Sequence, residues 1–525
     1  MNKFQIGPAQ KNSFCPKVLI SSDLSSVPSC GSVPERLFGV CRCPVRHPAM
    51  RARNGRPKRE FMKQRPRNSR ARGGRRKAAP RRDPLIGFET TATIREIGAR
   101  GDGIASVTVP NGANIIAYVD CVLPGDEVRV ALRQKRGDGY GAELIELITR
   151  SAPASEPRCS HFQSCGGCAL QHLDDAAYRD WKRQKAIIAL QRAGIEPDDA
   201  ENLVGAVEIS PPATRRRAGF AVHVSGSGVH VGFHGRFSHT VIDITDCAVL
   251  HPELMAFRDA FATFLRACEL AAAKVVNELF VTLVDNGLDV VIHASAEPGL
   301  DMRQDLAELA QDQDLARLSW KVGDAIDEPV AARRTPTVTF EGVVVPVPPG
   351  GFLQATHTGE VTLANAIKTA LQQIPARHVA DLFCGIGSFT FALALGGDRR
   401  NVLAVESDPR AVRSLQYAVG QSASPIKVVD RDLFRRPLDR SELSGLDLVL
   451  FDPPRAGALA QCENLAVDGP EWVLAVSCNP ATFARDIRML RNGGYEVQEV
   501  MPVDQFLWST HLEMFAVLRR RSPAV

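Results

Sequence analysis

Cys478 is the residue of this sequence best suited to nucleophilic chemistry. It lies in Ser477–Cys478–Asn479–Pro480, directly after the buried-strand pattern Val473–Val476. A cysteine at the carboxyl end of such a strand can project into a ligand crevice and attack a substrate there. The alternative is a small buried hydrophobic residue, which is a common role of cysteine. The Asn479–Pro480 pair at the edge of the crevice favours the nucleophile.

Asp452 is a second candidate at the same edge. It opens Asp452–Pro453–Pro454–Arg455, which follows the strand pattern Leu446–Phe451. Two consecutive prolines fix the backbone and remove two N–H donors, so the carboxylate is presented rigidly at the crevice. The segment resembles the Asp/Asn-Pro-Pro-Tyr/Phe motif of amino-group methyltransferases. Arg455 stands where those enzymes have the aromatic residue that stacks on the target base, and this disfavours that class.

A glycine turn between a strand and a helix predicts a cofactor site. The strand pattern His378–Phe383 runs into Cys384–Gly385–Ile386–Gly387–Ser388, and a helical pattern follows in Phe389–Leu395. Such a turn lets the backbone approach a ligand at the carboxyl end of the strand. Thr390 stands where the third glycine of a dinucleotide fingerprint would be, which disfavours NAD and FAD.

Acidic residues at successive strand ends indicate an adenosyl ligand. Glu406 ends the strand Asn401–Val405, 25 residues after Asp381, and a carboxylate there can accept both ribose hydroxyls. Asp432 follows the strand Ile426–Val429 and is placed to meet the adenine edge. Any one of these acids could be a solvated strand-end residue. Three of them after a glycine turn favour S-adenosylmethionine.

Four cysteines form a candidate metal site, in the spacing C-x5-C-x2-C with a distant fourth: Cys159, Cys165, Cys168 and Cys247. Four thiolates suit a structural zinc or an iron–sulfur cluster, and the residue types leave the metal open. Zinc sites usually pair two short hooks, whereas three ligands together and one distant are more common around clusters. The first gap of five residues differs from the C-x3-C-x2-C of radical enzymes and disfavours radical chemistry. Unliganded buried cysteines are the remaining alternative.

The net charge of +5 conceals two opposite parts. Residues 1–82 hold 21 of the 64 Lys and Arg but 3 of the 59 Asp and Glu, so they carry +18 and the remainder carries −13. We expect residues 1–84 to be a disordered basic extension. It could attract RNA phosphates or be a leader, and the true start could be Met50 or Met62. Residues 1–50 are Ser-rich and acid-poor like a transit peptide, but their four cysteines and several prolines fit that interpretation badly.

Composition excludes several other classes. The chain has 525 residues, 44% hydrophobic and 23% charged, and no run approaches the roughly 18 consecutive apolar residues of a membrane span. Thirteen cysteines are too few for a disulfide scaffold. At roughly 150 residues per domain, the length predicts about three or four domains.

Hydrophobic patterns divide the rest of the chain into three domains. Residues 85–150 contain five short segments rich in Val, Ile and Thr, which predict a small barrel of the OB type: Thr91–Ile97, Ala105–Val109, Ile115–Val119, Glu127–Leu132 and Glu143–Ile148. This barrel resembles a TRAM domain, an RNA-binding module. Residues 151–350 form the next domain, and residues 169–350 of it mix helix and strand patterns. The segment Ala176–Gly194 predicts an amphipathic helix, with Trp181, Ile187, Ile188 and Leu190 spaced for one face. The triplet Arg215–Arg217 could contact phosphate or form a solvated charge run. Residues 351–525 alternate strands and helices, which predicts a doubly wound α/β domain.

Together these motifs resemble the RNA uracil-C5 methyltransferase family, and within it the iron–sulfur, TRAM-containing branch that acts on 23S ribosomal RNA. The resemblance covers about residues 85–525. Besides the four cysteines it rests on Gly351–Phe352–Leu353–Gln354, Asp381–Phe389, Asp452–Arg455, Ser477–Pro480 and Thr510–Glu513. The family often has Phe-Pro-His-Thr before its catalytic base, where this chain has Phe506–Leu507–Trp508–Ser509–Thr510.

The resemblance implies a cytoplasmic, monomeric α/β multidomain enzyme with a TRAM barrel, a central α/β iron–sulfur domain and a Rossmann-like methyltransferase domain. It implies S-adenosylmethionine as methyl donor and a [4Fe–4S] cluster on the four cysteines. The implied cofactor-binding residues are Gln354, Phe383, Gly385, Gly387, Ser388, Glu406, Asp432 and Asp452. The implied catalytic residues are Cys478 as nucleophile, Glu513 as general base and Asp452 as a uracil-edge contact. The implied substrate is 23S ribosomal RNA with its target in a single-stranded or flipped-out loop.

The implied chemistry explains why a thiol and a base are both needed. Uracil C5 is too poor a nucleophile to take a methyl group directly, so the Cys478 thiolate first adds to C6. Glu513 would later remove the C5 proton, so that Cys478 can leave. Two alternatives stay open: the same chemistry on transfer RNA, and a non-catalytic RNA-binding protein with a redox-sensing cluster.

Overall fold

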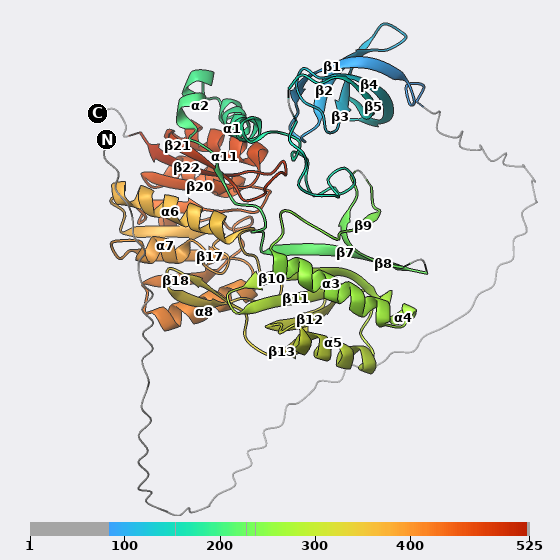
Figure 1. Cartoon of the computed structure of the whole chain (residues 1–525). Coiled ribbons are helices and arrows are strands. Elements are labelled where there is room, and N and C mark those ends of the chain that lie inside the picture. The colour runs from blue at the N-terminus through green and yellow to red at the C-terminus, as the bar shows by residue number, and fades with distance from the viewer. Residues whose placement is uncertain (1–82, 153, 227, 237, 522–525) are drawn as a thin grey trace, which may run out of the picture. The chain divides into compact units, whose positions relative to one another are not determined.

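A computed structural model of the protein describes residues 83–152, 154–226, 228–236 and 238–521 (Figure 1). The described residues all belong to one compact unit, Ala79–Val525. The basic extension predicted for residues 1–84 therefore lies almost wholly outside the described residues. In the described part of the chain, no helix combines the length and the apolar character needed to cross a membrane.

Five strands close into a barrel in the order β1-β2-β3-β5-β4. Their bounds are Glu89–Ile97 (β1), Gly103–Thr108 (β2), Asn114–Val119 (β3), Glu127–Arg136 (β4) and Gly139–Thr149 (β5). Alternate side chains such as Ile94, Val107 and Val130 fill the interior, because successive residues of a strand point to opposite faces. The small five-stranded barrel predicted for this part of the chain is present.

A second sheet has seven strands in the order β13-β12-β11-β10-β7-β8-β9. Its strands are Arg217–Ser225 (β7), Gly228–His234 (β8), Val241–Asp243 (β9), Val276–Val284 (β10), Gly287–Ala294 (β11), Arg317–Val322 (β12) and Glu328–Ala332 (β13). Helices α3 (Pro252–Ala267), α4 (Leu270–Ala273) and α5 (Leu300–Asp312) accompany it, and Phe257, Phe261 and Trp320 are buried between the layers (Figure 1). The mixed α/β pattern expected here is confirmed.

The C-terminal sheet has eight strands in the order β18-β17-β16-β19-β20-β22-β21-β6. Its strands are His378–Leu382 (β16), Asn401–Glu406 (β17), Ile426–Asp430 (β18), Leu448–Phe451 (β19), Trp472–Ser477 (β20), Tyr495–Asp504 (β21), Glu513–Arg520 (β22) and the short Glu208–Ile209 (β6). β16 to β20 are parallel, and β22 is antiparallel to β20 and β21. The strand order reverses between β16 and β19, and ligands of doubly wound sheets bind at such a point.

Helices cover both faces of this sheet, as the doubly wound prediction requires. They are α6 (His357–Gln373), α7 (Thr390–Leu395), α8 (Pro409–Ser422), α9 (Arg440–Leu443), α10 (Leu459–Asp468) and α11 (Pro480–Asn492). Leu363 of α6 and Leu393 of α7 belong to one buried cluster, and Leu465 of α10 and Ile487 of α11 belong to another. The hairpin of β14 (Thr337–Phe340) and β15 (Val343–Pro346) packs against α8.

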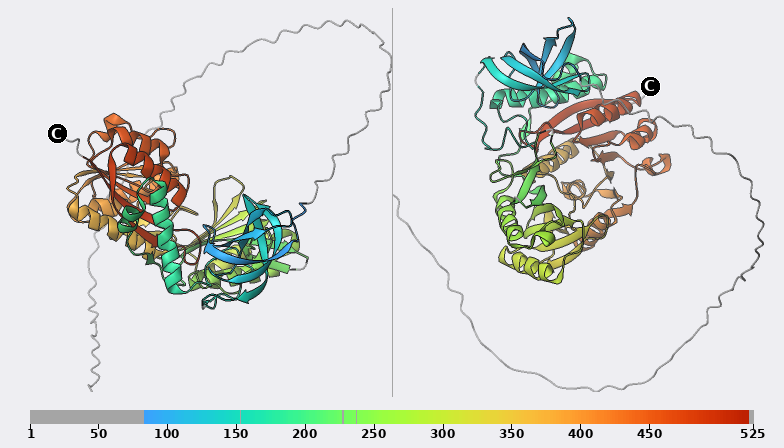
Figure 2. Two further views of the ribbon diagram at one scale, coloured as in Figure 1. Left: turned by 90° about the horizontal axis from the view of Figure 1, so that it is seen from above. Right: turned by 90° about the vertical axis from the view of Figure 1, so that its right-hand side faces the viewer.

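Helices α1 (Asp175–Arg192) and α2 (Pro197–Leu203) also pack on the C-terminal sheet, although both precede residue 350. α1 contacts α11 and β21, and Figures 1 and 2 show it beside these elements. The sequence pattern placed Trp181, Ile187, Ile188 and Leu190 on one face. Ile187 and Leu190 are buried in this core, but Ile188 is 42% exposed, whereas the charged Lys182 is fully buried.

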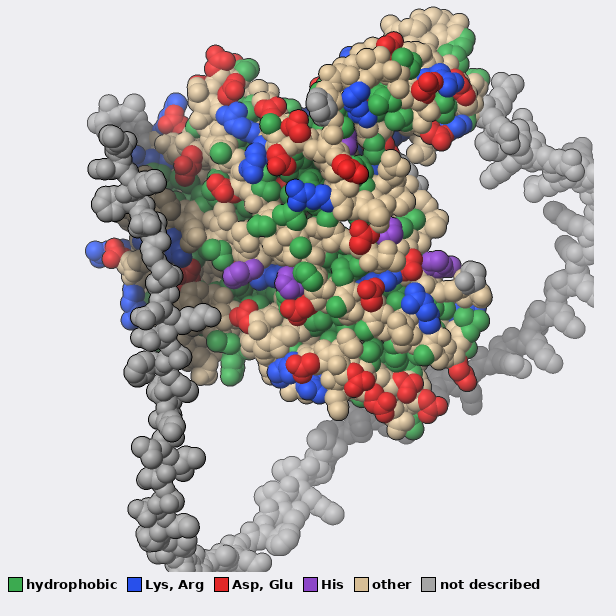
Figure 3. Space-filling view, viewed as in Figure 1, with side chains coloured by type: hydrophobic (Ala, Val, Ile, Leu, Met, Phe, Trp, Pro, Cys, Tyr) green, Lys and Arg blue, Asp and Glu red, His purple; other side chains and the backbone are tan. Residues whose placement is uncertain are grey.

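Basic and acidic side chains are interspersed over most of the face drawn in Figure 3. The acidic excess of this part of the chain therefore does not form a continuous negative surface there.

Candidate active site

A cavity of about 600 Å³ opens at the carboxyl ends of β16, β19 and β20, where the strand order reverses. Eight of the predicted site residues line it: Gln354, Phe383, Gly385, Ser388, Glu406, Asp452, Cys478 and Glu513. All three predicted catalytic residues thus share one cavity with most of the predicted cofactor residues.

The turn after β16 fixes the Glu406 carboxylate at the cavity wall. Phe383 (φ 61°) and Gly385 (φ 58°) adopt left-handed backbone angles, which are uncommon for phenylalanine. The Gly385 N–H donates to Glu406 Oε2 at 2.9 Å. Glu406 Oε1 accepts from the N–H groups of Ser407, at 2.6 Å, and Asp408, at 2.8 Å. A carboxylate held by three backbone donors is a rigid element of a binding site.

Two predicted cofactor residues lie outside the cavity wall. Gly387 packs on α8, because a Cβ at this position would lie 2.7 Å from Leu415 Cδ1. Asp432 accepts from the Phe434 N–H at 2.9 Å and pairs with Arg435 at 3.3 Å. The structure therefore gives Gly387 a packing position and Asp432 a turn-stabilising position, and the ligand contacts predicted for them stay predictions.

Phe434 lines the cavity where Asp432 was expected, and the sequence reasoning missed it. Its side chain is 49% exposed, and its ring centroid lies 5.4 Å from that of Phe383. The two rings form an aromatic surface of the kind that packs on the flat face of a purine. The sequence signal that could have identified Phe434 is its position two residues after the strand-end acid Asp432.

A chain of hydrogen bonds through two glutamines joins Asp452 to Glu513. Gln354 Nε2 donates to Asp452 Oδ2 at 3.0 Å. Gln505 Nε2 donates to Gln354 Oε1 at 2.6 Å and to Glu513 Oε2 at 3.3 Å. The Ala355 N–H donates to Gln505 Oε1 at 2.9 Å, which sets the direction of the Gln505 amide. Gln505 was not singled out from the sequence, and the Gln354 side chain is engaged with these groups.

Burial raises the pKa values of the two carboxyl groups and of the thiol in this cavity. Burial raises the pKa of Asp452 to about 7, and burial together with the Asp452 charge raises the pKa of Glu513 to about 8. Burial, followed by the charges of Glu513 and Asp452, raises the pKa of Cys478 to about 11, and Arg455 opposes this shift. At neutral pH the site therefore holds a thiol beside acids that are largely or partly protonated.

Arg455 and His511 line the cavity together with Cys478. Arg455 Nη2 lies 3.1 Å from His511 Nε2. Burial and the neighbouring Arg455 charge lower the pKa of His511 to about 4, so this imidazole is neutral and can accept from the guanidinium. The Asn479 amide nitrogen donates to the Arg455 carbonyl at 2.9 Å, and Asn479 also caps α11. The segment after Cys478 thus holds the Asp-Pro-Pro-Arg segment in place.

Within the arginine triplet, Arg216 is buried and is not part of a solvated charge run, whereas Arg215 and Arg217 line the cavity. Arg216 is 6% exposed and bonds to the Gln354 carbonyl at 3.0 Å and to Glu360 at 2.6 Å. Arg217 lies over the rings of Phe352, at 4.8 Å, and Phe280, at 5.3 Å. Arg216 is therefore buried where a solvated charge run would be exposed, because it stabilises the loop that carries Gln354.

The four predicted metal ligands come from two segments that the fold brings together. Ser160 Oγ donates to Asp246 Oδ1 at 2.6 Å, which ties the segment of Cys159 to that of Cys247. The Gly167 N–H donates to Cys165 Sγ at 3.3 Å. Among the described residues, no three or more His, Cys, Asp or Glu side chains are arranged to hold a metal ion. The predicted cluster is therefore not shown.

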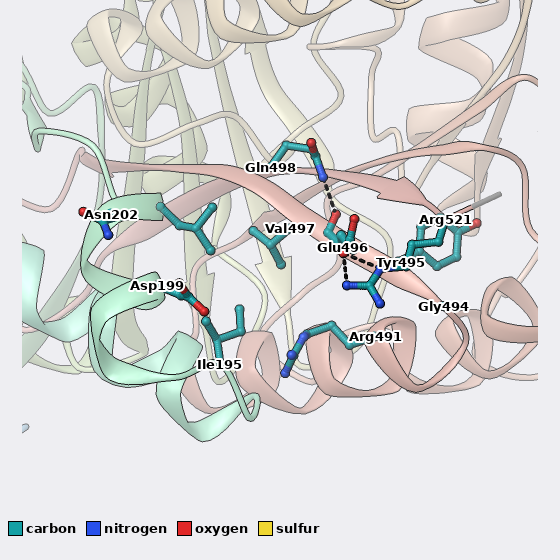
Figure 4. A pocket seen from close by; sticks show the side chains of 11 residues that line it. Ile195, Asp199, Asn202, Arg491, Gly494, Tyr495, Glu496, Val497, Gln498 and Arg521 are labelled. Atoms are coloured by element: carbon teal, nitrogen blue, oxygen red, sulfur yellow. Dashed lines mark hydrogen bonds and ion pairs between the residues drawn. The ribbon is translucent and has the colours of Figure 1, made fainter. Parts of the chain in front are cut away.

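Two other cavities differ in their relation to Cys478. One of about 920 Å³ lies between β1 and α1 and shares Arg455, Cys478 and His511 with the first. The other, of about 490 Å³, lies between α2 and β21 (Figure 4). None of the predicted site residues is among those that line it, and Glu496 in its wall is paired with Arg521. Of these three cavities in the described part of the chain, those of about 600 and 920 Å³ reach the candidate nucleophile.

Comparison with known proteins gives a consistent result. The pattern of the tRNA (uracil-5-)-methyltransferase family matches residues 352–521. An uncharacterized RNA methyltransferase of Brucella suis is 42% identical over 435 residues, which are 82% of this chain and 97% of the relative. The 23S rRNA (uracil(1939)-C(5))-methyltransferase of Chromohalobacter salexigens is 32% identical over 82% of this chain and 89% of its own. The crystal structure of the Pyrococcus abyssi tRNA (uracil-54, C5)-methyltransferase, solved with S-adenosyl-L-homocysteine, has a similar fold, with a TM-score of 0.60 at 20% identity over 82% of this chain and 100% of that one.

Proposed function

Because this chain belongs to the S-adenosylmethionine-dependent RNA (uracil-C5)-methyltransferase family, we propose that it methylates one uridine of 23S ribosomal RNA through a covalent Cys478 adduct. The observation that carries this proposal is the shared cavity of Cys478, Asp452 and Glu513, with Glu406 fixed at the same strand ends.

Cys478 starts the proposed reaction as a thiolate, after its proton is lost to solvent. The sulfur adds to C6 of uracil, the C5–C6 double bond opens, and negative charge develops on O4. C5 then takes the methyl group of S-adenosylmethionine, and S-adenosylhomocysteine leaves. Glu513 removes the C5 proton, the C6–S bond breaks, and the thiolate is regenerated.

Asp452 and Glu513 are suited to different parts of this sequence. With a pKa of about 7, Asp452 is partly ionised at neutral pH, and its carboxylate can accept a hydrogen bond from the N3–H at the uracil edge. Glu513, with a pKa of about 8, is a stronger base than an exposed glutamate once it is ionised. The hydrogen-bond chain through Gln354 and Gln505 keeps both carboxyl groups directed at the cavity.

The ribosomal substrate is supported by the relative from Chromohalobacter salexigens, which is named for 23S ribosomal RNA. The five-stranded barrel lies beside the cavity of about 920 Å³ that also reaches Cys478. It is therefore suited to bind the RNA that flanks the target. A base inside a helix cannot reach Cys478, so the target uridine would be single-stranded or flipped out. With this substrate we also propose a cytoplasmic location for the protein.

The same proposal keeps an iron–sulfur cluster on Cys159, Cys165, Cys168 and Cys247. Its support is the donor type, four thiols from two segments tied by the Ser160–Asp246 bond, and the amide donor at Cys165 Sγ. The cluster would hold these segments together, and it would take no part in the methyl transfer. Iron and sulfide content after anaerobic purification tests it, with a Cys165→Ser, Cys168→Ser variant as control. Bound zinc in place of iron, or no metal, would overturn it.

Mapping of 5-methyluridine by mass spectrometry tests the proposed substrate. Ribosomal and transfer RNA from a strain lacking the gene would be digested and compared with RNA from the parent strain. We expect one uridine of 23S RNA to lose its methyl group and to regain it in vitro with the purified protein. Loss in transfer RNA instead would support the same chemistry on that substrate, and no loss in either RNA would contradict the proposal.

A further inference from the structure

The loop between β21 and β22 carries Gln505 and His511 and leads into Glu513. Side chains of α1 hold this loop at both ends. The loop covers residues 505–512 and leads from Gln505, through His511, directly into Glu513 at the start of β22. Any displacement of this loop moves the proposed base relative to its substrate carbon.

Asp504 anchors the beginning of the loop. Lys182 Nζ lies 2.9 Å from Asp504 Oδ1, and the Tyr178 hydroxyl donates to Asp504 Oδ2. Asp504 and Lys182 are 0% exposed, and Tyr178 is 3% exposed. The next residue along the chain is Gln505, whose amide donates to Glu513.

The same two side chains of α1 also hold the middle and the end of the loop. The Trp508 N–H donates to the Tyr178 hydroxyl at 2.7 Å, where Trp508 has a left-handed backbone angle of φ 57°. Lys182 Nζ donates to the His511 carbonyl at 2.5 Å, two residues before Glu513. Each side chain therefore connects two points of the loop that are several residues apart.

A buried ion pair of this kind is weak evidence for stability, because the cost of removing two charges from water offsets most of their attraction. Its geometric effect is definite, since two side chains from one helix donate three hydrogen bonds that fix both ends of one loop. We propose that Tyr178 and Lys182 are positioning residues that set the place of Glu513 through Asp504 and the His511 carbonyl. This inference rests on the proposed function of Glu513.

The test removes both charges together, so that neither is left buried without a partner. The double variant Lys182→Met, Asp504→Asn keeps an oxygen that can still accept from the Phe506 N–H, which bonds to Asp504 Oδ1 at 3.1 Å. We expect a melting temperature close to that of the wild type, KM values within about threefold, and a kcat lower by about tenfold or more, as when a general base is misplaced. We also expect the covalent protein–RNA adduct to accumulate, because attack by Cys478 continues while proton removal slows.

Three further variants make the result decisive. Tyr178→Phe removes one hydroxyl and should show the same pattern more weakly, and Gln191→Met, at an exposed position of the same helix, should behave as wild type. Wild-type turnover without adduct in the double variant, while Glu513→Gln accumulates adduct, would overturn the positioning role alone. Loss of turnover in proportion to loss of folded protein, in both the double variant and Tyr178→Phe, would also overturn it. Normal turnover without adduct in Glu513→Gln would instead remove the proposed function, and this inference with it.

Discussion

Gln505 Nε2 lies 3.3 Å from Glu513 Oε2, and both side chains are almost completely buried. The Gln505 oxygen is already occupied by the Ala355 N–H, so the amide cannot reverse without losing that bond. Glu513 therefore has a fixed neighbour that donates to it. A donor at this place favours the carboxylate form and partly offsets the burial that raises the pKa of Glu513 to about 8.

Replacing Gln505 should impair the base without affecting cofactor binding. In Gln505→Leu the donor to Glu513 is lost, so the pKa of Glu513 should rise further and its side chain should lose its orientation. We expect kcat to fall about tenfold or more, with an unchanged Kd for S-adenosylmethionine. Steady-state kinetics and calorimetry measure the two quantities. Gln498→Leu, at an exposed position of the preceding strand β21, is the control, and equal kcat values for both variants would contradict the assignment.

The rate of methylation should rise with pH between about 6 and 9. Glu513 must be ionised to remove the C5 proton, and its pKa of about 8 means that the active form increases as the pH rises through that value. The pKa of Cys478, about 11, acts in the same direction, because the thiolate fraction also increases with pH. Single-turnover rates across this range measure the profile. A rate that falls from pH 6 to 9 would show that a protonated group does the limiting step.

Phe434, rather than Asp432, should matter for the cofactor. Its exposed ring faces the cavity beside Phe383, whereas Asp432 is engaged with Phe434 N–H and Arg435. We expect Phe434→Ala to weaken binding of S-adenosylmethionine by about five- to tenfold, the value of one aromatic contact. Asp432→Asn, which keeps the oxygen of the turn, should change it by less than about twofold. Calorimetric titration measures the affinity of both variants for S-adenosylmethionine. A larger loss of affinity in Asp432→Asn than in Phe434→Ala would support the sequence prediction for Asp432 instead.

The barrel, the central α/β sheet and the doubly wound C-terminal sheet could all be predicted from hydrophobic period and turn residues. The shared place of Cys478, Asp452 and Glu406 followed from their positions after parallel strands, because such ends meet at one edge of a sheet. The position of α1 could not be predicted in this way. Its pattern shows that one face is buried but does not tell which domain covers that face.

Side-chain direction accounts for most of the remaining differences. Asp432 follows a strand as Glu406 does, yet a local bond to the Phe434 N–H turns it into its own loop. Gln354 was assigned to the cofactor, but its amide links Asp452 to Gln505, 151 positions further along the chain. Contacts between residues so distant in sequence leave no local pattern, and Gln505 was missed for the same reason.

Removing residues 1–82 should change affinity and not catalysis. This segment carries +18, whereas the remainder, which holds the whole candidate site, carries −13. Each phosphate that the tail neutralises adds to the salt dependence of binding. We expect the shortened protein to bind RNA more weakly, with a flatter dependence of log K on log salt, and to retain turnover. Binding measured at several salt concentrations tests this, and an unchanged slope would contradict a role of this segment in RNA binding.

The covalent intermediate gives the most direct test of the central claim, that Cys478 attacks uracil and Glu513 completes the reaction. Glu513→Gln would be incubated with RNA and S-adenosylmethionine and run on a denaturing gel, beside wild type and the double variant Cys478→Ala, Glu513→Gln. We predict a slow-moving protein–RNA band for Glu513→Gln, with methylated uridine in the adduct, and no such band once Cys478 is also replaced. Wild-type turnover by Glu513→Gln without any adduct, or normal methylation by Cys478→Ala, would contradict the account.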